Sequence, residues 1–146
     1  MVHYLTVQDM LWINQEVTNE VNSFKHLQLE EGTYYQYGYG KSEEVLEQAG
    51  NFIQGFIRLR PFDKGNRATA LVAVLAFLEI NGYKINLEPN DAHTWAMQIA
   101  DKKITGINDV KNIATQSGTS ELNPALRVHV KRITEKFASA ISELTD

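Results

Sequence analysis

The chain has 146 residues, 43% hydrophobic and 22% charged, and its 18 acidic and 14 basic residues give a net charge of −4. This length suits one compact domain with its own core, so we expect a single domain over residues 1–146. The scattered charges argue against a nucleic-acid surface, and the absence of cysteine excludes disulfides and thiolate metal sites.

The start of the chain, "MVHYLTVQDML", lacks the basic flank and apolar run of a signal peptide. The apolar run Leu71–Leu78 is too short to span a bilayer. We therefore expect a cytoplasmic protein without membrane contacts.

Thr6 and Asp9 form a capping pair that predicts a first helix from Thr6 to about Ser23. Its apolar stripe consists of Met10, Ile13, Val17 and Val21. The following segment, 29–42, mixes glycines with tyrosines, which predicts an exposed loop or β-hairpin. Its tyrosines are Tyr34, Tyr35, Tyr37 and Tyr39.

Ser42 is the expected cap of a second helix, which must end before Pro61 because the residue ahead of a proline disfavours helical geometry. The buried stripe of this helix consists of Val45, Ala49, Phe52, Ile53, Phe56 and Ile57. The next helix, about Asn66 to Asn81, is apolar nearly all round and stops at Gly82, so we expect it at the centre of the fold.

Three further helices are expected. One begins at Asn90 or Asp91, a short one holds Ile107, Val110 and Ile113, and a long last one begins at Asn123-Pro124. The last helix carries one apolar face, made of Leu126, Val130, Ile133, Phe137, Ile141 and Leu144. The predicted class is all-α, a bundle around a buried central helix, with a short flap or hairpin before the second helix.

The loop ahead of the central helix has the composition of an anion site. Free amides at a helix start favour an anion, Gly65 lets the backbone approach it, and Lys64 and Arg67 add positive charge. The alternative is purely structural: Asn66 caps the helix, Gly65 makes the turn and the two cations are solvated.

The stretch "RPFDKGNRATAL", Arg60–Leu71, resembles the signature H-x-F-x-D/E-G/A-N-G/K-R of the Fic/Doc family, in its Doc-like (death-on-curing) branch, where T-A-L follows. The segments "HYLTVQDML" and "LAFLEINGYKI" extend the resemblance from Tyr4 to about Ser117. It implies the small six-helix bundle of that family. It also implies transfer of a phosphate or AMP group from ATP or another nucleotide to a protein hydroxyl, and a toxin held by an antitoxin or another protein partner.

Three chemical positions of the signature are changed. Arg60 stands where the family has its general-base histidine, Lys64 replaces the acidic magnesium ligand, and Ala68 replaces the arginine that grips phosphates. A guanidinium stays protonated, so Arg60 cannot abstract a proton, and Lys64 cannot hold magnesium, so we expect no metal. If one residue is taken as deleted, Arg67 becomes the final arginine, but T-A-L then falls out of register, so we prefer the ungapped alignment.

No other residue replaces the lost base, since the four histidines have no carboxylate partner at a useful spacing; they are His3, His26, His93 and His129. The residues expected to bind nucleotide phosphates are Lys64, Gly65, Asn66 and Arg67. In the family, the segment before the second helix is a flap that docks a target by strand addition, which assigns target docking to Tyr34, Tyr35, Tyr37 and Tyr39. The alternative is that these rings cover the core edge.

Two functions follow from these residues. The chain is either a Fic/Doc-like transferase or a catalytically degenerate relative that keeps the fold as an anion- or protein-binding regulatory module. The oligomeric state stays open.

Overall fold

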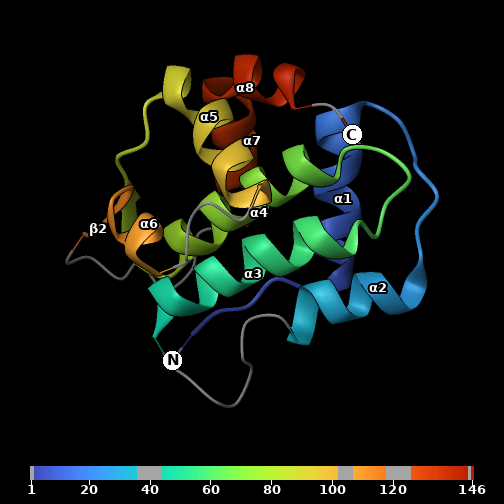
Figure 1. The fold of residues 1–146 in the computed structure, drawn as a ribbon, viewed down its shortest axis with the longest axis horizontal. Helices are drawn as coiled ribbons and strands as arrows, with labels where there is room; N and C mark the ends of the chain where they lie inside the picture. Colours follow the sequence, from blue (N-terminus) through green and yellow to red (C-terminus); the bar gives the residue numbers. More distant parts are fainter. Residues whose placement is uncertain (1, 36–43, 102–106, 118–125, 145) are drawn as a thin grey trace.

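The central helix α4, Asn66–Ile80, lies in the middle of the fold, among the other helices (Figure 1). In the computed structural model, which describes residues 2–35, 44–101, 107–117, 126–144 and 146, residues 68–78 of α4 are at most 3% exposed. An apolar helix with no polar face must be covered all round, and the other helices supply that cover. The predicted all-α class and the predicted central helix are both confirmed, with eight α-helices in the described part of the chain.

α3, Val45–Leu59, packs along α4 and buries its predicted stripe except for Val45, which stays partly exposed. It begins later than expected, because the carboxylate of Glu44 accepts a hydrogen bond from the Leu46 amide at 3.3 Å and caps the helix in place of Ser42. Ser42 itself lies outside the described residues. The predicted end before Pro61 is confirmed.

α1, Val7–Thr18, begins with the predicted capping box: the Thr6 hydroxyl accepts from the Asp9 amide at 3.1 Å, and Asp9 accepts from the Thr6 amide at 2.8 Å. The helix ends earlier than Ser23 because Asn19 turns left-handed, with φ of 58°. The chain then leaves the core, and Val21 is 83% exposed. The prediction that Val21 belongs to the buried stripe of this helix was therefore wrong.

Two short helical segments follow that the sequence did not predict, α2, His26–Glu30, and the π-helical turn η1, Glu31–Tyr35. Tyr34 and Tyr35 belong to η1, so the expected extended ribbon is wrong for both. The half-buried Tyr34 accepts a hydrogen bond from the Val7 amide at 3.0 Å, which ties η1 to the start of α1. Tyr37 and Tyr39 lie outside the described residues.

The second half of the chain covers the rest of α4. After β1, Tyr83–Ile85, come α5, Pro89–Ala100, and α6, Ile107–Lys111. β2, Ala114–Gln116, pairs antiparallel with β1, and Tyr83 faces Gln116. This small sheet was not predicted; α5 begins at Pro89, just ahead of the expected start, and Ile113 lies beyond α6.

The expected long last helix is two helices, α7, Leu126–Lys136, and α8, Ala138–Glu143. Phe137 interrupts them while staying buried, so the apolar face continues across the break. The expected cap at Asn123-Pro124 lies outside the described residues. No helix in the described ranges is long and apolar enough to cross a membrane.

Candidate functional site

The loop between α3 and α4 is closed by the side chain of Asn66, the first residue of α4. Its amide nitrogen Nδ2 donates to the Phe62 carbonyl, and its Oδ1 accepts from the Phe62 amide, both at 2.8 Å. Asn66 is fully buried, and Gly65 rather than Asn66 is the N-cap residue. The role of Asn66 is therefore to hold the loop's shape, and its side chain does not occupy the amides at the start of α4.

α1 supports the same loop from the other side. The buried Asn14 donates through Nδ2 to the Lys64 carbonyl at 2.9 Å and to the Thr69 hydroxyl at 3.1 Å. Gly65 has φ of +81°, and a Cβ there would lie 2.4 Å from Cγ2 of Thr18. The turn itself requires glycine at this position, as the structural alternative expected, and the close neighbour of Gly65 is α1. The approach of a phosphate to the Gly65 backbone stays a prediction.

An anion already lies at the start of α4, and it is a side chain of this protein. The carboxylate of Asp146 accepts from the Asn66 amide at 3.2 Å and from the Arg67 amide at 3.3 Å. Nη1 of Arg60 lies 3.7 Å from the same carboxylate, whose side chain is only 2% exposed. Figure 1 shows the C end of the chain beside α1, at the end of the molecule where α4 begins.

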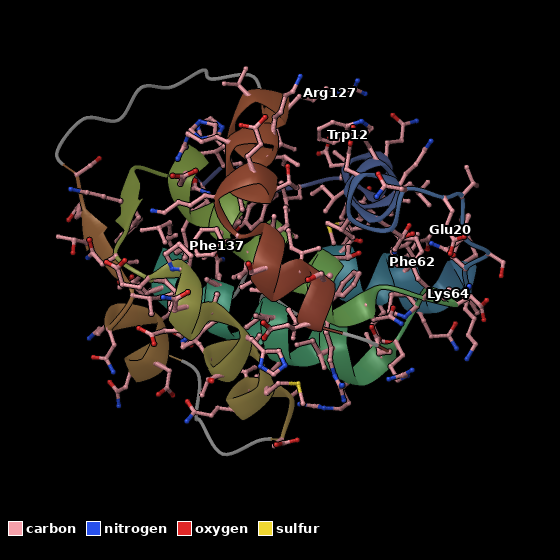
Figure 2. All side chains as sticks on the ribbon, turned by 90° about the horizontal axis from the view of Figure 1, so that it is seen from above. Trp12, Glu20, Phe62, Lys64, Arg127 and Phe137 are labelled. Atoms are coloured by element: carbon pink, nitrogen blue, oxygen red, sulfur yellow. The ribbon has the colours of Figure 1, made fainter. Side chains whose placement is uncertain are left out.

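The cations of the loop point in different directions. Nζ of Lys64 lies 3.4 Å from Oε1 of Glu20, and both side chains are largely exposed; Figure 2 shows them beside Phe62 at one end of the molecule. Arg67 instead lines a cavity of about 210 Å³ together with Arg58 and Arg60. The site thus contains a three-arginine cavity next to the α4 amides, while Lys64 belongs to a surface pair.

A larger cavity, of about 400 Å³, also has Arg60 in its lining. Arg58 and Lys25 line it, and so do Phe24 and Phe62, whose ring centres are 6.2 Å apart. The extended segment after α1 reaches it through an isolated antiparallel bridge between Phe24 and Phe62. This arrangement offers apolar and positively charged surface together.

Arg60 ends α3 in the left-handed conformation, with φ of 46°, and its guanidinium group is about half exposed. None of the four histidines lines either of these two cavities. The expectation that they lack carboxylate partners was wrong for three of them, since His26, His93 and His129 lie near Glu30, Glu143 and Glu79 respectively. Sequence spacing could have shown only the i,i+4 pair of His26 and Glu30.

The residues of the loop do not fit a magnesium ion. The ammonium of Lys64 stands at the position that would need an acidic ligand, and Mg²⁺ requires oxygen donors. Within the ranges that the structure describes, no group of three or more histidine, aspartate or glutamate side chains is placed to hold a metal.

Sequence reasoning missed two residues of this site. Asp146 lies 80 positions from Asn66, and nothing in the local pattern connects them. Arg58 falls in the last turn of α3, where a basic residue is ordinarily explained by the helix dipole.

The fold and the site together define a class: an α-helical bundle whose buried central helix starts at a turn that holds an anion on backbone amides. Residues 4–78, half of the chain, match the model of the Fic/DOC family. The chain belongs to the Fic/DOC family, as the signature indicated. Searches of curated proteins and of solved structures found no match.

Proposed function

We propose that this protein is a Fic/DOC member that binds a phosphate-bearing ligand, such as a nucleotide, at the α3–α4 loop without transferring a group from it. The single observation that supports this most is the carboxylate held by the Asn66 and Arg67 amides, since amides that hold a carboxylate suit a phosphate oxygen equally well. The proposed role is that of a regulatory module.

Loss of catalysis is proposed from the chemistry of Arg60. A general base must accept a proton near neutral pH, whereas a guanidinium group stays charged. Arg60 is suited instead to attract an anion, because it lies 3.7 Å from the Asp146 carboxylate and lines the cavity with Arg67. The three arginines would hold phosphate charge without a metal.

The first test is calorimetric titration of the purified protein with ATP and ADP, with and without magnesium. We expect binding that does not require magnesium and that weakens about tenfold or more in Arg67→Ala, because one charge-assisted contact to phosphate is lost. Lys84→Ala, an exposed lysine of β1, is the control and should bind as the wild type does. No heat with either nucleotide at millimolar concentration would contradict the proposal.

A second test asks whether the changed positions account for the loss of catalysis. The triple variant Arg60→His, Lys64→Asp, Ala68→Arg restores the family signature, and we expect it to transfer label from radioactive ATP to itself or to an added protein. The matched control is Lys64→Asp with Ala68→Arg alone, which still lacks the base. If the folded triple variant is as inactive as this control, the three positions do not explain the difference.

The alternative function is protein binding through the segment after α1. The exposed apolar side chains of this segment support it. Val21 and Leu27 are 83% and 75% exposed, and they flank Phe24 and Lys25 of the larger cavity. An antitoxin or another protein is the partner that the family resemblance suggests. A failed nucleotide titration would leave this surface as the place to examine.

A further inference from the structure

One buried side chain of α1, that of Asn14, holds the chain on both sides of the first amides of α4. Its Nδ2 donates to the Lys64 carbonyl at 2.9 Å and to the Thr69 hydroxyl at 3.1 Å. The Asn66 and Arg67 amides, which hold the carboxylate, lie between these two acceptors in the chain. The side chains of Asn14 and Thr69 are both buried, so water does not compete for the contact between them.

The contact with the Lys64 carbonyl constrains a peptide group that the local sequence leaves free to turn. The next residue, Gly65, has φ of +81°, and glycine permits both hands of the backbone. The Asn66 side chain binds the loop only to itself, through Phe62, whereas Asn14 binds it to another helix. Asn14 therefore fixes the loop and the first turn of α4 relative to α1, and with them the direction of the amides between.

A second asparagine, Asn22, fixes which way the Asn14 side chain faces. Nδ2 of Asn22 donates to Oδ1 of Asn14 at 3.0 Å and to the Thr18 hydroxyl at 2.9 Å. If the Asn14 amide were turned by half a rotation, its oxygen would face the Lys64 carbonyl oxygen and its nitrogen would face the Asn22 nitrogen. Both contacts would then be repulsive, since each would join two acceptors or two donors. Asn22 thus selects the orientation in which Asn14 donates to the loop.

We propose that Asn14 is the positioning residue of the phosphate site at the start of α4, and that Asn22 keeps it in the orientation that the site needs. This inference rests on the proposed function, because it concerns the same site. Neither asparagine lines the two cavities described above, so both act through the backbone that Asn14 holds. Because Asn22 lies in the segment after α1, that segment contributes to the affinity for phosphate without lining the site.

The experiment is calorimetric titration of the wild type, Asn14→Ala, Asn22→Ala and Gln48→Ala with magnesium-free ATP, together with urea denaturation of all four proteins. Gln48 is the matched control: it is another buried amide side chain, donates to the Tyr4 hydroxyl at 2.8 Å, and lies at the end of α3 opposite the loop. Asn22 is only half-buried, so its replacement disturbs the packing less than Asn14→Ala does.

We expect Asn14→Ala to bind ATP about tenfold more weakly than the wild type and Asn22→Ala about threefold, which are the factors for losing all or part of one ordinary hydrogen bond. Gln48→Ala should lose stability as Asn14→Ala does, yet bind ATP within about twofold of the wild type, because distant sites act independently. In NMR spectra recorded without ATP, the Asn66 and Arg67 amide signals should shift in both site variants and stay in place in the control.

ATP binding by the wild type, with equal affinities for folded Asn14→Ala and Asn22→Ala, overturns the positioning role but leaves the proposed function standing. A loss of affinity as large in Gln48→Ala also overturns that role, because affinity would then follow stability alone. If Asn14→Ala does not unfold cooperatively, Asn22→Ala decides by the same criterion. Absence of ATP binding by the wild type overturns the proposed function, and the positioning role with it.

Discussion

At the scale of single residues, two independent reasons require glycine at position 65: its backbone conformation and the lack of space for a side chain. It needs φ of +81°, and a Cβ would also lie 2.4 Å from the Thr18 methyl carbon and 3.1 Å from the Asn14 amide nitrogen. Gly82 has a similar φ of +88° with nothing within 4 Å of a Cβ. A substitution at Gly82 therefore measures the cost of backbone strain alone, whereas a substitution at Gly65 measures backbone strain and steric contact together.

We predict that Gly82→Ala lowers the free energy of unfolding by on the order of 1 kcal/mol, from backbone strain alone. Gly65→Ala should lower it by about 3 kcal/mol, because α1 and the loop must also move apart. Urea denaturation of both variants gives the comparison. Equal decreases in the free energy of unfolding would mean that Thr18 and Asn14 move aside at no cost. That result would contradict the close packing described for this loop.

Asn66 and Gly65 could be found from the sequence, because the shape of a loop ahead of a helix is a local property. The mechanism assigned to Asn66 still changed: its side chain binds both backbone groups of Phe62 and does not cap α4. Asp146 could not be found, because its contact with the loop exists only after α8 has packed. No local pattern encodes a contact between residues so far apart in the chain.

At the scale of elements, α4 is fastened to α7 by a polar cluster near its C-terminal end. Oε1 of Glu79 accepts from Nη2 of Arg132 at 2.6 Å and lies 3.2 Å from Nδ1 of His129. The Glu79 side chain is only 12% exposed. Such a shielded, charge-assisted contact is stronger than an ordinary surface ion pair.

Glu79→Gln should therefore lower the free energy of unfolding by about 2 kcal/mol, since the acceptor loses its charge while Arg132 keeps its own. Glu135→Gln, an exposed carboxylate of α7, is the matched control and should stay within about 0.5 kcal/mol of the wild type. Thermal and urea unfolding at low salt measure both. A loss in Glu79→Gln no larger than in the control would show that apolar packing alone joins α4 to α7.

The long helices were predictable because each carries a strong local signal: the capping box at Thr6, the stripe of α3 and the apolar run of α4. The short elements were not. α2 and η1 have five residues each and β1 and β2 three, too few to show a period. The break at Phe137 was hidden for the opposite reason, since the apolar spacing of α7 continues into α8.

At the scale of the whole molecule, the family match and the folding unit have different extents. The match covers residues 4–78, which include α1, α3 and nearly all of α4. The cover of α4 includes α5, α7 and α8, which all lie beyond it. The matched half therefore contains the site loop, and the other half completes the core.

A fragment ending at Ile80 should consequently fail to fold cooperatively, because the faces of α4 that pack against α5, α7 and α8 would be exposed to water. Circular dichroism should show residual helix but no sharp thermal transition, in contrast to the full chain. Mixing the fragment with a second one, residues 81–146, should restore a thermal transition if each half buries the apolar surface that the other leaves exposed. A sharp transition in the first fragment alone would contradict this.

Because α4 is apolar on every side, its orientation in the core needs a separate explanation. A helix without a polar face has no amphipathic direction, so hydrophobic burial alone does not fix its rotation about its own axis. The fixed points are polar and lie at its two ends: Asn66 on the Phe62 backbone, and Asn81 on the His3 backbone at 2.7 and 2.9 Å. Together with the Asn14–Thr69 hydrogen bond and the contacts of Glu79 with α7, these two asparagines set the angle of the central helix about its axis, and thereby the direction in which its first amides face.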